Sequence, residues 1–285
     1  MKYGLSLLLW SDEMNDGLIP VLRLLKRMGY DGVEAPMFDL DESLWTEWAG
    51  RLDDLGLART AVHTVSAEHN PVSSDPVVRH RAYEHMQAVV DCCAAFGASA
   101  LVGPHQIALG SFDRRGDIAD EWKLSVDHIR RVAEYAESAG VALVEEVLNR
   151  FEQYLVTTIA DAVRFVDEVD HPNCRIHLDT FHAHIEEKHT ADAVSLAGSR
   201  IGYVHVSEND RGIPGTGQVA WGPIFDALHD IGYDGWLTIE SFGRAFPLAA
   251  GTSRIVRPVF ESQRQVAVEG LAFVKSQVAR WSSPA

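Results

Sequence analysis

The sequence reads Met28-Gly-Tyr-Asp-Gly32 near its start and Ile231-Gly-Tyr-Asp-Gly235 near its end, each time between an amphipathic segment and a short apolar run. A shorter version, Leu55-Gly-Leu57, occupies the same place between two other such segments. Glycine at such a join fits the left-handed cap of a helix, because a residue without a Cβ carries no steric penalty there. The recurrence therefore indicates a repeated helix-to-strand unit.

Short apolar runs alternate with longer amphipathic segments outward from these joins to both ends of the chain. The runs predict eight strands, over Tyr3–Leu9, Gly32–Ala35, Ala58–His63, Ala98–Val102, Val141–Glu146, Arg175–Asp179, Ile201–Val206 and Trp236–Glu240. The longer segments predict helices near Gly17–Met28, Leu44–Leu55, Asp75–Phe96, Trp122–Ser138, Ile159–Val169, Thr190–Gly198, Trp221–Ile231 and Glu261–Arg280. Alternation of this kind implies a parallel sheet with right-handed crossovers. Eight units in 285 residues favour closure, so we predict an α/β fold, a (β/α)8 TIM barrel forming one domain over residues 1–285 with a C-terminal helix.

The formal charge of −16 limits the partners of this protein. An acidic surface repels phosphate backbones and anionic lipids, so we expect neither a nucleic acid nor a membrane as partner. The apolar start Met1–Trp10 is too short for a signal peptide, and no run approaches the roughly 20 apolar residues of a membrane span. The three cysteines, Cys92, Cys93 and Cys174, form no disulfide pattern and suit a reducing compartment. We therefore expect a cytoplasmic protein.

Acidic residues and one histidine stand at or near the ends of four consecutive predicted strands: Glu145-Glu146, Asp179, His205 and Glu240. In a parallel barrel the carboxyl ends of the strands form the active-site face. Carboxylates gathered there repel one another and lose their hydration, so they need a cation. Oxygen ligands with one imidazole suit Mn²⁺, Mg²⁺ or Co²⁺ better than a structural zinc site. Side chains alternate along a strand, so only one of Glu145 and Glu146 faces the cation, and the alternation alone leaves the choice open.

Four stretches resemble the ketose 3-epimerase family, which includes D-tagatose and D-psicose 3-epimerases, within the xylose-isomerase-like superfamily. They are Glu146-Val-Leu-Asn-Arg-Phe-Glu-Gln-Tyr154, Leu178-Asp-Thr-Phe-His-Ala-His-Ile-Glu-Glu187, Gly202-Tyr-Val-His-Val-Ser-Glu-Asn-Asp-Arg211 and Gly232-Tyr-Asp-Gly-Trp-Leu-Thr-Ile-Glu-Ser-Phe242. The resemblance is strong over roughly residues 140–245. One departure is Ser241, where the family has proline between the glutamate and the phenylalanine.

The resemblance implies specific roles for residues in these stretches. The metal ligands of the family fall on Glu146, Asp179, His205 and Glu240, and its substrate-contacting residues fall on Glu152, His182 and Arg211. The implied reaction is epimerisation of a free ketose at C3 through an enediolate, with Glu146 and Glu240 as acid and base. The implied cofactor is a divalent metal, Mn²⁺ before Co²⁺ or Mg²⁺, and the implied assembly is a homodimer or homotetramer.

Three other functions fit the same barrel. An aldose–ketose isomerase would use the same metal and glutamates but would move a proton between C1 and C2. A metal-dependent endonuclease fits the acidic charge poorly and lacks a multi-histidine zinc pattern. A non-catalytic sugar-binding barrel would require the loss of a ligand or base, and none is missing.

Several other residues have competing interpretations. Arg211 could instead belong to the surface of its glycine- and proline-rich loop, and His177 is best interpreted as a hydrogen-bonded core histidine. His182 and Glu186 have i,i+4 spacing, but a solvated start of a helix explains this pair better than a metal motif. Residues that follow the strands and could complete the sugar pocket are Trp10, His63, His105, Gln106, Phe242 and Phe246.

Overall fold

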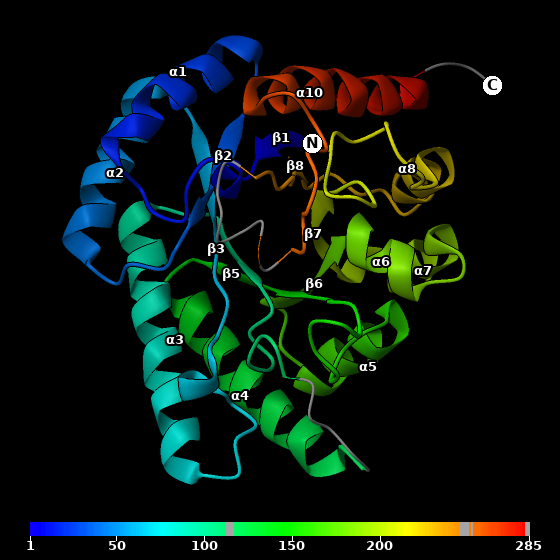
Figure 1. Ribbon diagram of the computed structural model, residues 1–285. Helices are drawn as coiled ribbons and strands as arrows, with labels where there is room; N and C mark the ends of the chain where they lie inside the picture. Colours follow the sequence, from blue (N-terminus) through cyan, green and yellow to red (C-terminus); the bar gives the residue numbers. More distant parts are fainter. Residues whose placement is uncertain (112–116, 245–250, 252, 283–285) are drawn as a thin grey trace.

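Eight strands pair in parallel, in the order β1-β8-β7-β6-β5-β4-β3-β2, in the computed structural model (Figure 1), which describes residues 1–111, 117–244, 251 and 253–282. Their bounds are β1 Lys2–Leu5, β2 Gly32–Pro36, β3 Ala58–Val62, β4 Ala100–Gly103, β5 Ala142–Glu146, β6 Cys174–Asp179, β7 Ile201–Val206 and β8 Trp236–Ile239. A parallel bridge between Ser6 and Glu34 joins the two outer strands and closes the ring. The predicted single-domain TIM barrel is confirmed.

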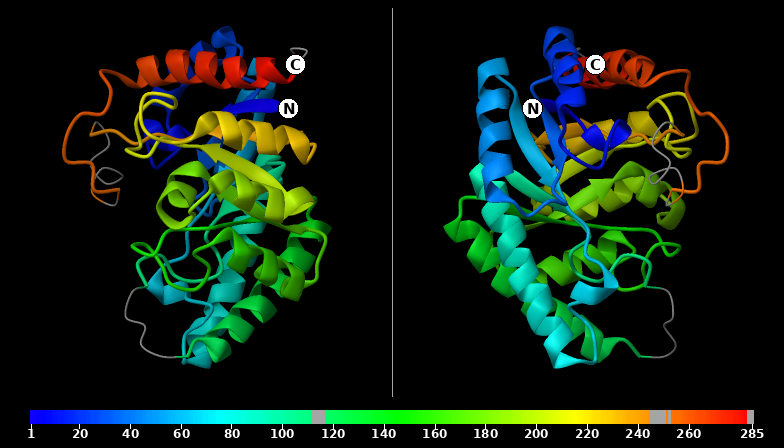
Figure 2. Two further views of the ribbon diagram at one scale, coloured as in Figure 1. Left: turned by 90° about the vertical axis from the view of Figure 1, so that its right-hand side faces the viewer. Right: turned by 60° about the vertical axis from the view of Figure 1, so that its left-hand side comes forward.

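Helices form a ring outside the strands (Figures 1 and 2). Their bounds are α1 Ile19–Met28, α2 Glu42–Leu55, α3 Pro76–Phe96, α4 Ala119–Ser138, α5 Ile159–Val169, α6 Thr180–Glu186, α7 Thr190–Ala197, α8 Trp221–Asp230 and α10 Gln263–Ala279. Within the described ranges, no helix combines the length and the apolar character that crossing a membrane requires.

The glycines of the repeated helix-to-strand joins have two different structural roles. Gly29, Gly56 and Gly232 have φ values of 89°, 63° and 69°, so each takes the left-handed conformation predicted after a helix. Gly32, the last residue of the first join, is needed for space instead. A Cβ on Gly32 would lie 2.1 Å from the carbonyl oxygen of Ala58, because β2 and β3 approach closely there.

The predicted first strand was too long. Only Lys2–Leu5 is a strand, and Leu7–Leu9 forms a 3-10 turn that buries Leu7 and Leu9. A run of apolar residues fits a buried strand and a buried turn equally well, so periodicity could not separate the two. The turn begins directly after Ser6, the residue that closes the barrel, and leaves Leu8 facing the cavity described below.

The C-terminal helix α10 packs across the outside of the barrel beside α1 and α8 (Figure 2). The Tyr30 hydroxyl donates a hydrogen bond of 2.8 Å to the backbone oxygen of Ala267, and the rings of Trp221 and Phe273 meet edge to face at 5.3 Å. The predicted C-terminal helix is therefore an integral part of the outer layer.

Replacing Gly32 with alanine should destabilise the protein, because the new Cβ meets backbone atoms that cannot move away cheaply. We expect a loss of about 1–3 kcal/mol in the free energy of unfolding, as for overpacked interiors. Gly50→Ala, in the exposed middle of α2 with nothing within 4 Å of the new Cβ, is the control and should gain about 0.5–1 kcal/mol. Urea unfolding measures both variants, and equal stability of the two would contradict the steric role of Gly32.

Candidate active site

Four side chains from consecutive strands meet at the mouth of the barrel. Glu146 ends β5, Asp179 ends β6, His205 lies in β7 and Glu240 follows β8 directly. All four are buried. The Nδ1 atom of His205 lies 3.9 Å from Glu146 Oε1, 3.8 Å from Asp179 Oδ2 and 3.5 Å from Glu240 Oε1. The residues predicted as metal ligands are thus brought together around one imidazole nitrogen.

The donor set fits a divalent cation. His205 Nδ1 is buried and has no hydrogen-bond partner in the described part of the chain, although three carboxylates surround it. A buried nitrogen without a partner is costly, and carboxylates gathered in a buried site require positive charge. One imidazole with three carboxylates is a ligand set for Mn²⁺, Mg²⁺ or Co²⁺.

The other ring nitrogen of His205 is held by a residue that the sequence analysis missed. Its Nε2 atom lies 2.8 Å from Glu34 Oε2, and both residues are fully buried. A metal-binding histidine usually donates its second N–H to a carboxylate, which fixes the tautomer and directs the free lone pair at the metal. A lone glutamate within the otherwise apolar strand β2 was the available clue in the sequence.

Arg211 lies inside this cluster and not on the loop surface, so the surface interpretation was wrong. Its Nη1 atom donates to Asp179 Oδ2 at 2.8 Å and to Glu240 Oε2 at 2.5 Å. The guanidinium carbon lies 3.8 Å from the ring centre of Phe181 and 5.1 Å from that of Phe242. The guanidinium therefore sits between two aromatic rings and partly neutralises the carboxylates.

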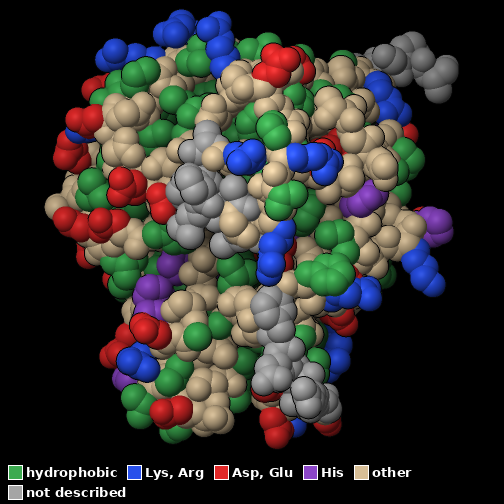
Figure 3. All heavy atoms as spheres, in the orientation of Figure 1, with side chains coloured by type: hydrophobic (Ala, Val, Ile, Leu, Met, Phe, Trp, Pro, Cys, Tyr) green, Lys and Arg blue, Asp and Glu red, His purple; other side chains and the backbone are tan. Residues whose placement is uncertain are grey.

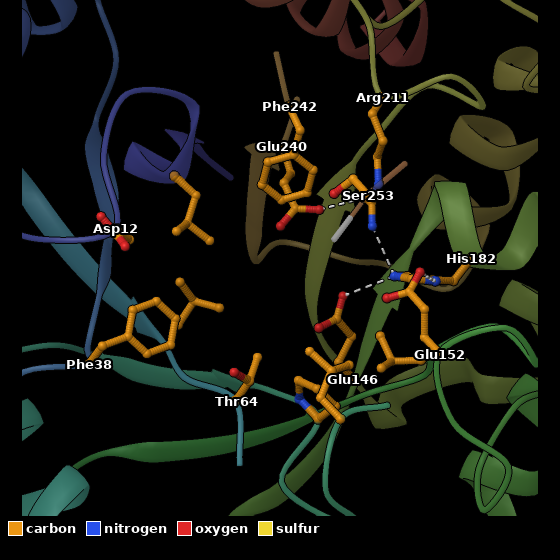
Figure 4. Close-up of a pocket in the computed structure, with 15 residues that line it drawn as sticks. Asp12, Phe38, Thr64, Glu146, Glu152, His182, Arg211, Glu240, Phe242 and Ser253 are labelled. Carbon is orange, nitrogen blue, oxygen red and sulfur yellow. Dashed lines mark hydrogen bonds and ion pairs between the residues drawn. The ribbon is translucent and has the colours of Figure 1, made fainter. Parts of the chain in front are cut away.

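His182 and Glu152 extend the cluster toward the opening of the barrel (Figure 4). The backbone N–H of Asn149 donates to His182 Nδ1 at 3.1 Å, and Arg211 Nη2, which can only donate, lies 3.1 Å from His182 Nε2. That nitrogen lies 3.7 Å from Glu146 Oε1 and 3.7 Å from Asp179 Oδ2. The Asn149 side chain donates to Glu152 Oε1 at 2.8 Å. His182 and Arg211 therefore adjoin the predicted ligands, and Glu152 adjoins His182, with its Oε1 atom 3.8 Å from His182 Nδ1.

These side chains line one cavity of about 220 Å³ at the mouth. Its walls include five of the predicted site residues, Glu146, Glu152, His182, Arg211 and Glu240, and the predicted pocket residue Phe242. The apolar part of the wall contains residues that the sequence did not single out, among them Leu8, Phe38, Val62, Leu109 and Leu148. Figure 4 shows Glu146 and Glu240 entering the cavity from different sides.

Comparison with known proteins identifies the family. A family model described as Xylose isomerase-like TIM barrel matches residues 22–277. The chain is 33% identical to the L-ribulose 3-epimerase of Methylomonas sp. (strain DH-1), over 97% of this chain and 98% of that protein.

The chain belongs to the ketose 3-epimerase family.

Solved structures agree with this assignment. The D-allulose 3-epimerase from Methylomonas sp. in complex with D-allulose superposes with a TM-score of 0.90 at 32% identity, covering 97% of each chain. The D-psicose 3-epimerase from Clostridium cellulolyticum H10 with D-tagatose gives a TM-score of 0.90 at 29% identity, covering 99% of this chain and 100% of that one. The protein is a sugar epimerase of the ketose 3-epimerase type, with a buried carboxylate–histidine cluster of the kind that holds a divalent metal.

Of the two adjacent glutamates that end β5, the one assigned by the family resemblance faces the cavity. Glu146 points into the cavity, whereas Glu145 points away and accepts a hydrogen bond of 2.9 Å from His105 Nδ1. Alternation along the strand predicted that only one of them could face the site, and this is what the structure shows.

Several predicted pocket residues lie elsewhere. Trp10, His63, His105 and Gln106 do not line the cavity. His105 binds Glu145, and Gln106 donates to the backbone oxygen of Glu146 at 2.7 Å. Both residues therefore stabilise the end of β5 outside the cavity. Phe246 lies outside the described residues. A position just after a strand end was a weak criterion for predicting that a residue lines the cavity, because the loops turn these side chains away from the barrel axis.

Two interpretations of other charged residues were partly wrong. His177 is buried below His205, with ring centres 4.2 Å apart, but neither of its ring nitrogens has a hydrogen-bond partner among the described residues. The side chain of Glu186 is 3% exposed and binds Arg150 at 2.7 Å, so it is neither solvated nor directed at His182.

Glu208 organises the loop that carries Arg211. Its carboxylate accepts hydrogen bonds from the backbone N–H groups of residues 209, 215 and 219 and from the Trp221 indole at 3.0 Å. Arg211 has a φ of 61°, which is strained for arginine, and its N–H donates to the Glu208 backbone oxygen at 2.9 Å. Glu208, two positions after the end of β7, therefore holds the loop that presents the arginine.

Burial and neighbouring charges move the pKa values of the cluster apart. Burial raises the pKa of Glu240 to about 7, and burial together with the charge of Glu240 raises the pKa of Glu146 well above its ordinary value. Burial also acts on Asp179, but Arg211 and the nearby histidines outweigh it and lower the pKa of Asp179. Burial opposes the charged form of His205, yet Glu34 raises its pKa to about 10. Two glutamates with raised pKa values thus stand beside an aspartate whose pKa is lowered.

Glu34→Gln should weaken divalent metal binding, because His205 loses the charged acceptor that orients its ring. We expect Mn²⁺ affinity to fall about 10- to 100-fold, as for other residues that support a metal-binding histidine. Isothermal titration calorimetry of the metal-free protein measures the change. Glu47→Gln on the surface of α2 is the control, and equal affinity in both variants would remove Glu34 from this role.

In the absence of metal, the free energy of unfolding of the wild-type protein should fall relative to that of Glu240→Gln as pH rises from about 5 to 7.5. The folded-state pKa of Glu240 is raised, so its contribution to stability is complete below the ordinary value of 4.5 and disappears as pH passes through about 7. Urea unfolding in EDTA measures the difference between the two proteins, which cancels the titration of histidines common to both. A difference that does not change with pH would contradict the raised pKa.

Proposed function

We propose that this protein epimerises a free ketose at C3, with Glu146 and Glu240 as the acid–base pair. The observation that carries the proposal is that these two glutamates, both with raised pKa values, enter one small cavity from different sides. Inversion at a carbon requires removal of a proton from one face and return of a proton to the other. Two carboxyl groups with raised pKa values, one on each side of the cavity, supply the acid and the base for that chemistry.

The proton moves between the substrate and these two side chains. One glutamate, ionised, removes the proton at C3 and leaves an enediolate. The other, protonated, returns a proton to the opposite face of the same carbon, and the roles exchange for the reverse substrate. Each such transfer contributes about 10²–10⁴-fold to the rate.

The remaining residues bind and orient the sugar. We assign Glu146, Asp179, His205 and Glu240 to a divalent metal, preferably Mn²⁺, which when bound would polarise the oxygens next to the reacting carbon. Arg211 then offers hydrogen-bond donors to the substrate, and His182 and Glu152 stand beside it. Phe181 and Phe242 fix the plane of the Arg211 guanidinium, so its donors are oriented before the sugar arrives.

The size and lining of the cavity favour one unphosphorylated sugar. Its volume of about 220 Å³ lies below the roughly 300–1,000 Å³ typical of drug-sized ligands. Among the described residues that line the cavity, Arg211 is the one lysine or arginine, and it is already paired with Asp179 and Glu240. The relatives bound to D-allulose and D-tagatose support a free ketose as substrate. The cytoplasmic location and the dimer or tetramer remain predictions.

The reaction can be tested by hydrogen exchange in D₂O. With Mn²⁺ added, we expect D-fructose, D-tagatose, L-ribulose or D-erythrulose to exchange the C3 hydrogen and yield the C3 epimer where C3 is a stereocentre, as measured by NMR. Glu240→Gln should lower kcat by about 10²–10⁴-fold, whereas the exposed control Glu13→Gln should not. Exchange only at C1 or C2 would identify an aldose–ketose isomerase and overturn the proposal.

A further inference from the structure

A carboxylate that takes no part in the proposed proton transfer lines the same cavity. Asp12 stands across the cavity from His182, on the side where Phe38 lies (Figure 4). Asp12 is half-buried, and its carboxylate has no hydrogen bond or ion pair within the described part of the chain. The other acidic side chains of the described wall each contact a basic or amide group. The acceptor oxygens of Asp12 are therefore available to a ligand.

The backbone on both sides of Asp12 is held in place. The N–H groups of Trp10 and Ser11 donate to the Leu7 backbone oxygen at 2.8 and 3.1 Å. The N–H of Glu13 donates to the Ser11 hydroxyl at 3.2 Å. These bonds form because β1 ends early and the chain passes into the 3-10 turn at the mouth of the barrel. Asp12 is thus positioned before a substrate arrives, which lowers the entropy cost of binding.

The place of the reacting carbon decides which part of the sugar faces Asp12. C3 has to lie between Glu146 and Glu240, and the donors of Arg211 lie on the side of the cavity beside His182. The carbonyl end of the ketose needs those donors, because negative charge develops on its oxygens in the enediolate. The carbons beyond C3 then extend the other way, and their hydroxyls approach Asp12.

The charge around Asp12 favours a neutral group as its partner. Figure 3 shows acidic side chains gathered over α2, whose exposed acidic residues are Glu42, Glu47, Asp53 and Asp54. This helix contacts the segment that follows Asp12 through the ion pair between Arg51 and Asp16 at 2.6 Å. A phosphate or carboxylate at this end of the sugar would be repelled, whereas a hydroxyl can donate to Asp12.

We propose that Asp12 accepts a hydrogen bond from a hydroxyl beyond C4 and so favours six-carbon ketoses over D-erythrulose, which has no such hydroxyl. The direction of the sugar in this inference rests on the proposed function. The apolar side chains Leu8 and Phe38, which also line the cavity, offer no hydrogen bond and cannot make this distinction. Asp12 touches no reacting atom, so it determines specificity and does not catalyse.

The ratio of kcat/KM on two sugars tests the role of Asp12. Hydrogen exchange in D₂O with Mn²⁺ gives this value for D-tagatose and for D-erythrulose. Asp12→Ala should lower the value for D-tagatose about 10-fold relative to that for D-erythrulose, the lower end for a hydrogen bond to a charged group, because Asp12 is half-buried. Asp12→Asn keeps an acceptor oxygen and should recover part of the loss.

The control is Glu13→Gln, at the exposed next residue, which should leave the ratio unchanged. An equal fall for both sugars in Asp12→Ala, or no fall for either, would overturn the assignment.

Failure of the proposed function gives a different result. Exchange at C1 or C2 alone in the wild type would overturn the C3 epimerase, yet the ratio between the two sugars can still be read from that exchange. If the wild type labels neither sugar, titration of the Mn²⁺-loaded proteins by ligand-observed NMR gives the two dissociation constants instead. An affinity for D-tagatose that Asp12→Ala leaves unchanged would then overturn the role of Asp12.

Discussion

The carboxylates of Glu146, Asp179 and Glu240 repel one another inside a barrel mouth that water hardly reaches. Removing charges from water costs several kcal/mol for each, so the surrounding structure has to supply compensating positive charge. His205 and Arg211 do so from neighbouring elements, and a divalent cation would complete the balance. This electrostatic requirement explains why so many polar residues around the mouth have a defined partner.

The contacts that position His205 and Arg211 extend well beyond the cavity. His205 depends on Glu34, which lies in β2 across the barrel, and this contact is made only because the ring of strands is closed. Arg211 depends on Glu208 for its loop and on two aromatic rings for its orientation. The site is therefore fixed by the complete barrel and not by one motif, as preorganised electrostatics requires.

The histidines illustrate how position decides chemistry. His205, beside three carboxylates and Glu34, is held in the charged form in the metal-free protein, whereas His63 and His85, beside other histidines, are neutral. The same residue type is therefore charged in one place and neutral in the other, because neighbouring carboxylates stabilise the imidazolium and neighbouring histidines do not.

The sequence by itself determined the repeat, the barrel and the four strand-end residues, because helix caps, apolar periodicity and strand polarity are local properties. It did not determine where β1 ends, since a buried turn and a strand have the same apolar pattern. It also did not reveal Glu34, which lies 171 positions before its partner His205. Only the tertiary structure decided that Arg211 enters the cavity and that His63 turns toward α3, because loop conformation and contacts between distant strands depend on how the whole chain packs.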